Sequence, residues 1–282
     1  MVDKTTVVKC GGNAAVQAGL ICRDVAALVA DGHRVVLVHG GSADIGRISE
    51  RLGVRRRELV SPDGVTTRYT DAETLDVVTM ALAGRTKPRL VSALQQAGVA
   101  AIGLTGLDGG LLKAKRVQAL RAIIDGRLTL VRDNHAGRIV DVNAELLELL
   151  LDAGLVPVVS PPARAEDGRP VNSDADRAAA AVSGALGADT LVMLTGAPGV
   201  LTDASDEESV MPVVAVPPRG APPHVGGGMA LKLVAAREAL AAGVDRVLIG
   251  DGRRTDPVRA SLAGESTTVR VDDTPAAGDH HE

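Results

Sequence analysis

Short apolar runs alternate with longer amphipathic stretches along the chain. The apolar runs predict buried strands at Thr5–Cys10, Val35–Val38, Val99–Leu104, Val156–Ser160, Thr190–Leu194 and Arg246–Ile249. A 3.6-residue pattern predicts helices from residue 42 to about Leu52 and over about Ala14–Ala30, Asn143–Ala153, Asp176–Leu186 and Met229–Ala242. Continuous apolar strands that alternate with helices are typical of a parallel sheet covered on both faces. We therefore predict an α/β fold, a three-layer αβα sandwich with a mainly parallel central sheet.

Three segments depart from this alternation. The turn signal Pro62-Asp63-Gly64 lies between β-prone flanks and predicts a hairpin over Leu59–Thr70. A second hairpin is predicted over Leu128–Val140, with its turn near Asn134–Gly137. Pro161–Pro170 is expected to be a polar loop between two halves of the chain. We therefore expect a single domain over residues 1–271, with lobes at about 1–165 and about 170–271, and a frayed acidic tail at 272–282.

The composition excludes several classes of function. The chain has no Phe, no Trp and one Tyr, Tyr69, so it lacks the aromatic platforms on which single-stranded nucleic acids stack. The net charge of −4 also disfavours nucleic acid as a partner. Residues 1–6 contain no leader-like pattern, and no apolar run approaches about 20 residues. We expect a cytoplasmic protein without membrane contact.

Glycine pairs follow two of the predicted strands, in Lys9-Cys10-Gly11-Gly12 and in His39-Gly40-Gly41-Ser42. Ligands of open α/β sheets bind at the carboxyl ends of strands, where bare amides attract anions. Each pair alone also fits an ordinary tight turn. Lys9 is more unusual, because a buried strand rarely carries an unpaired ammonium group. His39 is expected to be a structural residue at its strand end.

Two further motifs open helices in the second half. The first is Asn172-Ser173-Asp174-Ala175-Asp176, which offers more polar side chains than one helix cap needs. The second is the segment 226–232, which reads GGGMALK and places Lys232 in the first turns of a helix. Read singly, these residues also fit caps and a solvated lysine.

Together these four motifs resemble the amino acid kinase family, and the resemblance covers essentially the whole chain. It points to the acetylglutamate kinase branch, in which ATP phosphorylates a side-chain carboxylate to an acyl phosphate. The resemblance implies that Lys9 and Lys232 neutralise the transferred phosphoryl group and that Asp176 orients both lysines. It also implies four amides that bind the phosphoryl oxygens, those of Gly11, Gly12, Gly40 and Gly41.

The remaining roles also come from this resemblance. The acyl substrate would be held by Ser42, Arg68, Asn172 and Asp174. The nucleotide would be held by Thr195, Gly196, Gly199, Gly228 and Met229. Mg²⁺ is expected on the ATP phosphates rather than in a metal site of the protein, and a homodimer is expected. Three positions depart from the usual pattern: Ser42 replaces a third glycine, Asp174 replaces Asn, and Gly196 replaces Asp or Asn.

The segment Ser61–Thr70 (SPDGVTTRYT) resembles the subfamily that acts on 2-aminoadipate or glutamate joined through its amino group to LysW, a small acidic carrier protein. From Arg85 to Arg132 the chain has nine Lys or Arg and two Asp or Glu, which suggests a basic face for such a partner. The expected carrier contacts are Arg55, Arg56, Arg57, Lys113, Lys115 and Arg116. Two alternatives remain: a kinase of free N-acetylglutamate and a ligand sensor without turnover.

Overall fold

The computed structural model describes residues 4–60, 66–117, 120–124, 127–220, 222 and 225–272. Its strands are β1 (Thr5–Cys10), β2 (Arg34–His39), β3 (Glu58–Val60), β4 (Thr66–Arg68), β5 (Ala101–Gly106), β6 (Leu112–Arg116), β7 (Leu120–Ile124), β8 (Arg127–Val131), β9 (Gly137–Val142), β10 (Val156–Ala165), β11 (Pro170–Val171), β12 (Thr190–Thr195), β13 (Val213–Val216), β14 (Arg246–Asp251) and β15 (Thr267–Val271). Its α-helices are α1 (Ala18–Ala30), α2 (Ser42–Leu52), α3 (Ala72–Ala81), α4 (Lys87–Gln96), α5 (Ala144–Asp152), α6 (Ala175–Ala185), α7 (Gly227–Ala241) and α8 (Pro257–Leu262). A π-helical turn, η1 (Leu82–Thr86), joins α3 to α4, and a 3-10 turn, η2 (Asp108–Gly110), follows β5.

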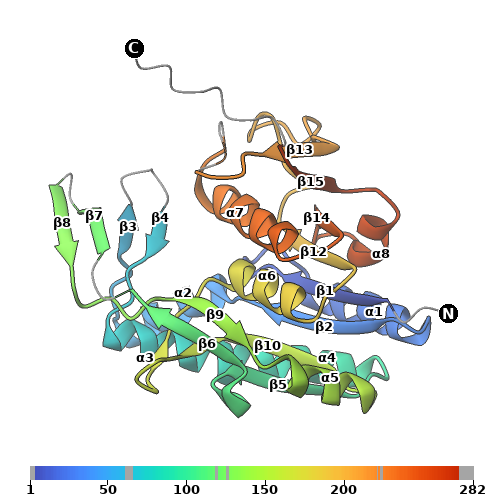
Figure 1. Ribbon diagram of the computed structural model, residues 1–282, viewed down its shortest axis with the longest axis horizontal. Coiled ribbons are helices and arrows are strands. Elements are labelled where there is room, and N and C mark those ends of the chain that lie inside the picture. The colour runs from blue at the N-terminus through green and yellow to red at the C-terminus, as the bar shows by residue number, and fades with distance from the viewer. Residues whose placement is uncertain are drawn as a thin grey trace.

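One large sheet runs through both halves of the chain (Figure 1). Its order is β13-β15-β14-β12-β1-β2-β10-β6-β9, and β5 and β11 also pair with β10. The central pairs β12–β1, β1–β2 and β2–β10 are parallel, so their carboxyl ends meet at one edge. This confirms the predicted α/β class and the mainly parallel sheet. The boundary between two lobes stays a prediction, since the sheet is continuous across it.

Helices cover both faces of the large sheet. On one face α1, α4 and α8 enclose a core of Val, Leu, Ile and Cys side chains that includes Leu37, Leu90 and Val158. On the other face α5, α6 and α7 enclose a second core, in which alanines of α6 and α7 let the helices approach the sheet closely. A core without Phe or Trp therefore closes through small and branched side chains that interdigitate.

The first predicted hairpin is confirmed, because β3 pairs antiparallel with β4. Its expected turn lies outside the described residues. The second predicted hairpin is wrong: β8 pairs with β7 in a small sheet of order β4-β3-β7-β8, whereas β9 pairs with β6 in the large sheet. Residues 132–136 therefore connect two sheets instead of turning one strand back on the other.

The expected polar loop at Pro161–Pro170 is also wrong in its first half. Strand β10 continues through the cis peptide bond Pro161-Pro162 as far as Ala165, and β11 then pairs with it. The strand persists because Ala163 and Ala165 are buried in the core, which outweighs the missing amide donors of the prolines. Of the predicted tail, Asp272 donates its N–H to Val216 O, and residues 273–282 lie outside the described part.

Candidate functional site

Three charged side chains meet at the carboxyl edge of the sheet, each from a different element. Lys9 comes from β1, Asp176 from the first turn of α6 and Lys232 from α7. Lys9 Nζ lies 2.8 Å from Asp176 Oδ1, and Lys232 Nζ lies 2.9 and 3.1 Å from Oδ1 and Oδ2. The three residues are only 5–7% exposed. Two ammonium groups share this one carboxylate, and the carboxyl group of Asp174 also acts on both of them.

The electrostatics of this cluster depend on mutual neutralisation. Burial alone would raise the pKa of Asp176, but the charges of Lys9 and Lys232 outweigh it and lower the pKa to about 2. Burial lowers the pKa of Lys232, and the charge of Lys9 lowers it further, against the pull of Asp176. Burial also disfavours the charged form of Lys9, but Asp176 holds the pKa of Lys9 above its usual value. The carboxylate of Asp176 therefore opposes the effect of burial on the pKa of both lysines.

The two Gly-Gly turns pack directly against each other beside this cluster. Cys10 and His39 are paired across β1 and β2, so both turns begin at the same level. A Cβ built on Gly12 would collide with the backbone nitrogen of Gly41, and one on Gly11 would lie 2.8 Å from Leu194 O. Neither turn can thus accept a side chain without moving. Gly41 is the N-cap of α2, so the first amides of that helix also point toward this edge.

Two predicted substrate-binding residues, Ser42 and Asp174, form hydrogen bonds with the backbone of the site. Ser42 Oγ donates to Gly12 O at 2.8 Å and so joins the two turns, a role that the sequence analysis had not assigned to it. Asp174 caps α6 by accepting from the N–H groups of Asp176 and Arg177, both at 3.0 Å. Of the four glycine amides expected to bind phosphate, that of Gly40 already donates to Cys10 O at 3.5 Å.

The β3–β4 hairpin is joined to the entry of α6 by a chain of hydrogen bonds. Asn172 Nδ2 donates to Thr70 Oγ1 at 3.2 Å, and Thr70 N donates to Asn134 Oδ1 at 3.1 Å. The backbone adds His135 N to Thr70 O at 2.6 Å and Asn172 N to His135 O at 2.8 Å. Arg68 stands two residues before Thr70 and is partly buried. The structure thus brings Arg68 and Asn172 to the same region, through contacts of Thr70, Asn134 and His135 that the sequence analysis did not predict.

The predicted nucleotide residues occupy two places. Thr195 ends β12, and Gly196 follows it, packed so closely on Asn13 that a Cβ would lie 2.8 Å from its Nδ2. Gly228 and Met229 lie in the first turn of α7, which begins at an exposed glycine stretch. Gly199 is buried against Thr267 of β15, so its lack of a side chain serves packing there.

The predicted basic contacts are not all equally available. Arg57 pairs with Asp71 and lies over the ring of Tyr69, 4.2 Å from its centroid. Lys113 pairs with Asp141 at 2.6 Å across β6 and β9. Arg116 is partly buried and donates to a backbone carbonyl at 3.2 Å, whereas Arg55, Arg56 and Lys115 are exposed. The Arg85–Arg132 window also does not form one basic face, because Lys87 is buried and Arg85 pairs with Asp44.

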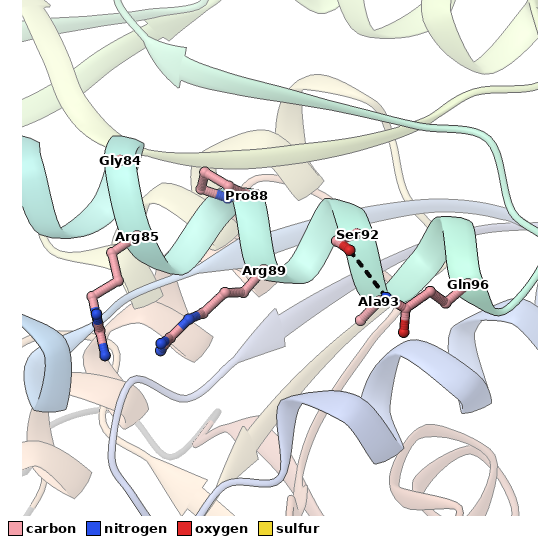
Figure 2. A pocket seen from close by; sticks show the side chains of 7 residues that line it. All are labelled: Gly84, Arg85, Pro88, Arg89, Ser92, Ala93 and Gln96. Atoms are coloured by element: carbon pink, nitrogen blue, oxygen red, sulfur yellow. Dashed lines mark hydrogen bonds between the residues drawn. The ribbon is translucent and has the colours of Figure 1, made fainter.

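The turn η1 is a further part of the site that no sequence signal marked. Its residues Leu82 and Thr86 contact the Gly41 position, and Thr86 Oγ1 donates to Asp44 of α2 at 3.0 Å. Its outer side opens into a cavity of about 440 Å³ (Figure 2). That cavity is lined by Gly84, Arg85, Pro88, Arg89, Ser92, Ala93 and Gln96, and none of these belongs to the lysine cluster. We therefore place the candidate site at the strand ends.

His39 is buried between the glycine turn and Lys87. Its Nδ1 lies 2.9 Å from Gly40 O, whereas its Nε2 has no partner in the described residues. Burial, with smaller contributions from the charges of Lys87 and Lys9, lowers the pKa of His39 to about 4, although its bond to Gly40 opposes the shift. The ring is therefore neutral at pH 7 with its proton on Nδ1, where it donates to Gly40 O and fixes the turn. The predicted structural role fits this geometry.

The comparisons with known proteins agree with this geometry. The sequence profile described as "Amino acid kinase family" matches residues 4–251. The chain belongs to the amino acid kinase family. The kinase is 40% identical over 266 residues to the [LysW]-aminoadipate kinase of Deinococcus radiodurans, covering 93% of this chain and 90% of the relative. It is 38% identical to the protein of that name from Thermus thermophilus, covering 94% and 99%.

Other relatives carry a different name. The acetylglutamate kinase of Methanopyrus kandleri is 42% identical over 241 residues, which cover 83% of this chain and 90% of the relative. Among solved structures, the carbamate kinase of Giardia matches with a TM-score of 0.66 at 15% identity, covering 96% of this chain and all of that one. The resemblance seen in the sequence and the predicted fold are thereby confirmed. In the described residues, no helix is both long and apolar enough for a membrane span.

Asp176→Asn should reveal how far the lysine cluster stabilises the fold. Near neutral pH we expect the free energy of unfolding to fall by about 3–5 kcal/mol, because two buried ammonium groups lose their carboxylate. The folded pKa of about 2 lies below the ordinary 3.8, so the stabilisation by ionised Asp176 is complete above pH 4 and is lost as the pH falls toward 2. Urea unfolding between pH 7 and pH 2.5 should show that the free energies of unfolding of the unmodified protein and of Asp176→Asn converge at acid pH.

The control for this experiment is Asp152→Asn, which removes an ion pair with Arg34 whose Asp side chain is 72% exposed. We expect it to cost less than about 1 kcal/mol. If the loss of unfolding free energy in Asp176→Asn stayed constant down to pH 2.5, it would contradict the assigned role of the ionised carboxylate.

The tautomer of His39 is a second prediction. The ¹⁵N NMR signals should show a proton on Nδ1 and none on Nε2, unchanged from pH 8 to pH 5, because the pKa is about 4. His39→Asn can keep a donor near Nδ1, whereas His39→Gln places it near Nε2, so the Asn variant should be more stable by about 1 kcal/mol. A titration midpoint near 6.5 would disprove the assignment.

Proposed function

We propose that this protein is an ATP-dependent kinase that phosphorylates the side-chain carboxylate of 2-aminoadipate linked to an acidic LysW-like carrier protein. The observation that carries the proposal is the buried cluster of Lys9, Asp176 and Lys232 beside two interlocked glycine turns. The names of the Deinococcus and Thermus relatives support the choice of substrate. The reaction would serve lysine biosynthesis or a related carrier-based pathway in the cytoplasm.

The chemistry requires two anions to approach each other. A carboxylate oxygen of the substrate bonds to the γ-phosphorus of ATP while the bond to the ADP oxygen breaks, and ADP leaves. No base is needed, since the carboxylate is already ionised at neutral pH. Lys9 and Lys232 would neutralise the charge on the transferred group, and the amides of Gly11, Gly12 and Gly41 would bind its oxygens. Positioning and charge neutralisation account for most of the acceleration in such transfers.

The glycine cradle and the two lysines of the cluster fit a polyphosphate. In the described residues, no three His, Cys, Asp or Glu side chains gather as cation ligands. We therefore propose that Mg²⁺ enters with ATP, held by its phosphates, where it would screen their charge. Thr195, Gly196, Gly228 and Met229 would contact the nucleotide.

On the acceptor side, Arg68 would bind the α-carboxylate of the substrate through paired charge-assisted hydrogen bonds, and Asn172 would bind near it. Arg55, Arg56 and Lys115, which are exposed, would meet the acidic carrier. Arg57 and Lys113 would contact the carrier only after breaking their ion pairs with Asp71 and Asp141. A homodimer is part of the proposal.

A second candidate is a kinase of free N-acetylglutamate in arginine biosynthesis, which the 42% identity to the Methanopyrus acetylglutamate kinase favours. A sensor without turnover is a weaker alternative, because Lys9, Asp176 and Lys232 are all present and in contact.

ATP turnover should be assayed with three substrates: carrier-linked aminoadipate, carrier-linked glutamate and free N-acetylglutamate. We expect the highest kcat/KM with carrier-linked aminoadipate, measured as acyl phosphate trapped by hydroxylamine. Turnover with free N-acetylglutamate alone would replace the proposal by the second candidate. Turnover with none of the three would favour the sensor.

Lys9→Ala and Lys232→Ala should each lower kcat by at least about 100-fold, the usual loss when one group that stabilises transition-state charge is removed. Lys4→Ala, at an exposed lysine just before β1, serves as the control and should retain its rate. Near-normal rates in either of the first two variants would refute the assigned roles.

A further inference from the structure

Arg56 and Arg68 project from the same face of the β3–β4 hairpin. Glu58 and Arg68 are directly opposite each other in the ladder. The hydrogen bond from Tyr69 N to Arg57 O, at 3.0 Å, extends the pairing beyond the end of β3. Because side chains alternate along paired strands, Arg56 lies on the face of Glu58 and Arg68.

The opposite face of the hairpin is already occupied. There Arg57 lies over the ring of Tyr69 and pairs with Asp71. By the same alternation Arg55 also belongs to that face. Arg55 and Arg56 are adjacent in sequence and both exposed, yet they point to different sides of the hairpin.

The face that carries Arg56 is the one directed at the candidate site. Thr70, next in the alternation after Arg68, accepts the hydrogen bond from Asn172. Arg56 Nη1 lies 3.0 Å from the point where Gly46 of α2 would carry a Cβ. Gly46 is about one turn inside α2, whose N-terminus adjoins the glycine turns. The guanidinium of Arg56 is therefore held between the hairpin and α2, near the acceptor side of the site.

The two guanidinium groups lack full compensation. In the described part of the chain, neither Arg56 nor Arg68 forms an ion pair, and Glu58 is the one acidic group that acts on Arg68 from this face. Burial and the charge of Arg56 lower the pKa of Arg68, so the pair is electrostatically unfavourable as it stands. Such an arrangement is expected where anionic groups of a ligand approach both cations.

The number of anions distinguishes the substrates. In a free N-acetylated amino acid, the side-chain carboxylate points at the phosphoryl group. The α-carboxylate is then the one remaining anion, and Arg68 is sufficient to bind it. A substrate amide-linked through its amino group to an acidic protein brings further carboxylates at that end. The amino nitrogen and the α-carboxylate are attached to the same carbon, so the carrier must leave the site close to Arg68.

We propose that Arg56 is a specificity-determining residue that binds a carboxylate on the carrier side of the amide, beside the α-carboxylate bound by Arg68. The inference rests on the proposed function and deepens it. Arg56 thereby favours carrier-linked over free substrates, and it contributes to binding the acyl substrate rather than to the transfer step.

Arg56→Gln in the full-length enzyme tests this. We expect kcat/KM for carrier-linked aminoadipate to fall about 10- to 100-fold through KM, as for the loss of a charge-assisted hydrogen bond. The KM for ATP and kcat/KM for free N-acetyl-aminoadipate should stay within about 2-fold. Arg56→Lys should have an intermediate kcat/KM, because lysine keeps the positive charge but lacks the planar guanidinium group that can form two parallel hydrogen bonds. Arg51→Gln is the control, equal in charge change and placed at an exposed arginine in the last turn of α2, and should have less than about 3-fold effect.

The outcomes separate the inference from the function on which it rests. If the unmodified enzyme phosphorylates carrier-linked aminoadipate and Arg56→Gln leaves its KM unchanged, the role of Arg56 is disproved and the function stands. Equal losses for Arg51→Gln and Arg56→Gln would show diffuse attraction and also overturn the assignment, as would equal losses with linked and free substrates. If the unmodified enzyme does not turn over the carrier-linked substrate, both proposals fail.

Discussion

The contact of one buried carboxylate with two buried lysines is the constraint on which the rest of the site depends. Asp176 cannot leave the cluster without stranding two ammonium groups away from water, which is costly. The contact therefore fixes β1, α6 and α7 relative to one another, although they are far apart in sequence. It also holds two ammonium groups at the edge of the sheet where the glycine turns lie. The three side chains that would carry the proposed chemistry thus also join three distant elements of the fold.

Much of this arrangement could be predicted from the sequence. The bounds of β1 agree with the prediction, and Asn143 caps α5 through a bond to Leu146 N, as its position indicated. The residue pattern singled out a strand-end lysine and two polar helix entries, and strand direction placed all three at one edge of the sheet. The joint role of Lys9, Asp176 and Lys232 came from the resemblance to the amino acid kinase family. The structure places the three side chains in contact.

What the sequence did not predict depends on pairing between distant segments. The apolar run of β8 is equally suited to β9 and β7, and only the register of the small sheet decides between them. Strand β10 passes through two prolines because burial of its alanines outweighs local preference. The hydrogen bond between Thr70 and Asn134 and the packing of η1 on Gly41 had no signal in the sequence, since both depend on neighbours that the fold supplies. Substrate binding by Ser42 and Asp174 stays a prediction, and their hydrogen bonds show a bracing role that residue type alone does not reveal.

The continuous sheet has a geometric consequence for any group that moves between the two sides of the site. Under the proposed function the turn after β2 would belong to the acceptor side and the end of β12 to the nucleotide side, and β1 lies between these two strands. Two steps between adjacent strands, each about 4.8 Å, therefore set the span at about 10 Å. This span is built into the backbone hydrogen-bond ladder and does not depend on a hinge between separate bodies. A large opening of the donor from the acceptor would require the sheet to twist, with Lys9 at the axis of that twist.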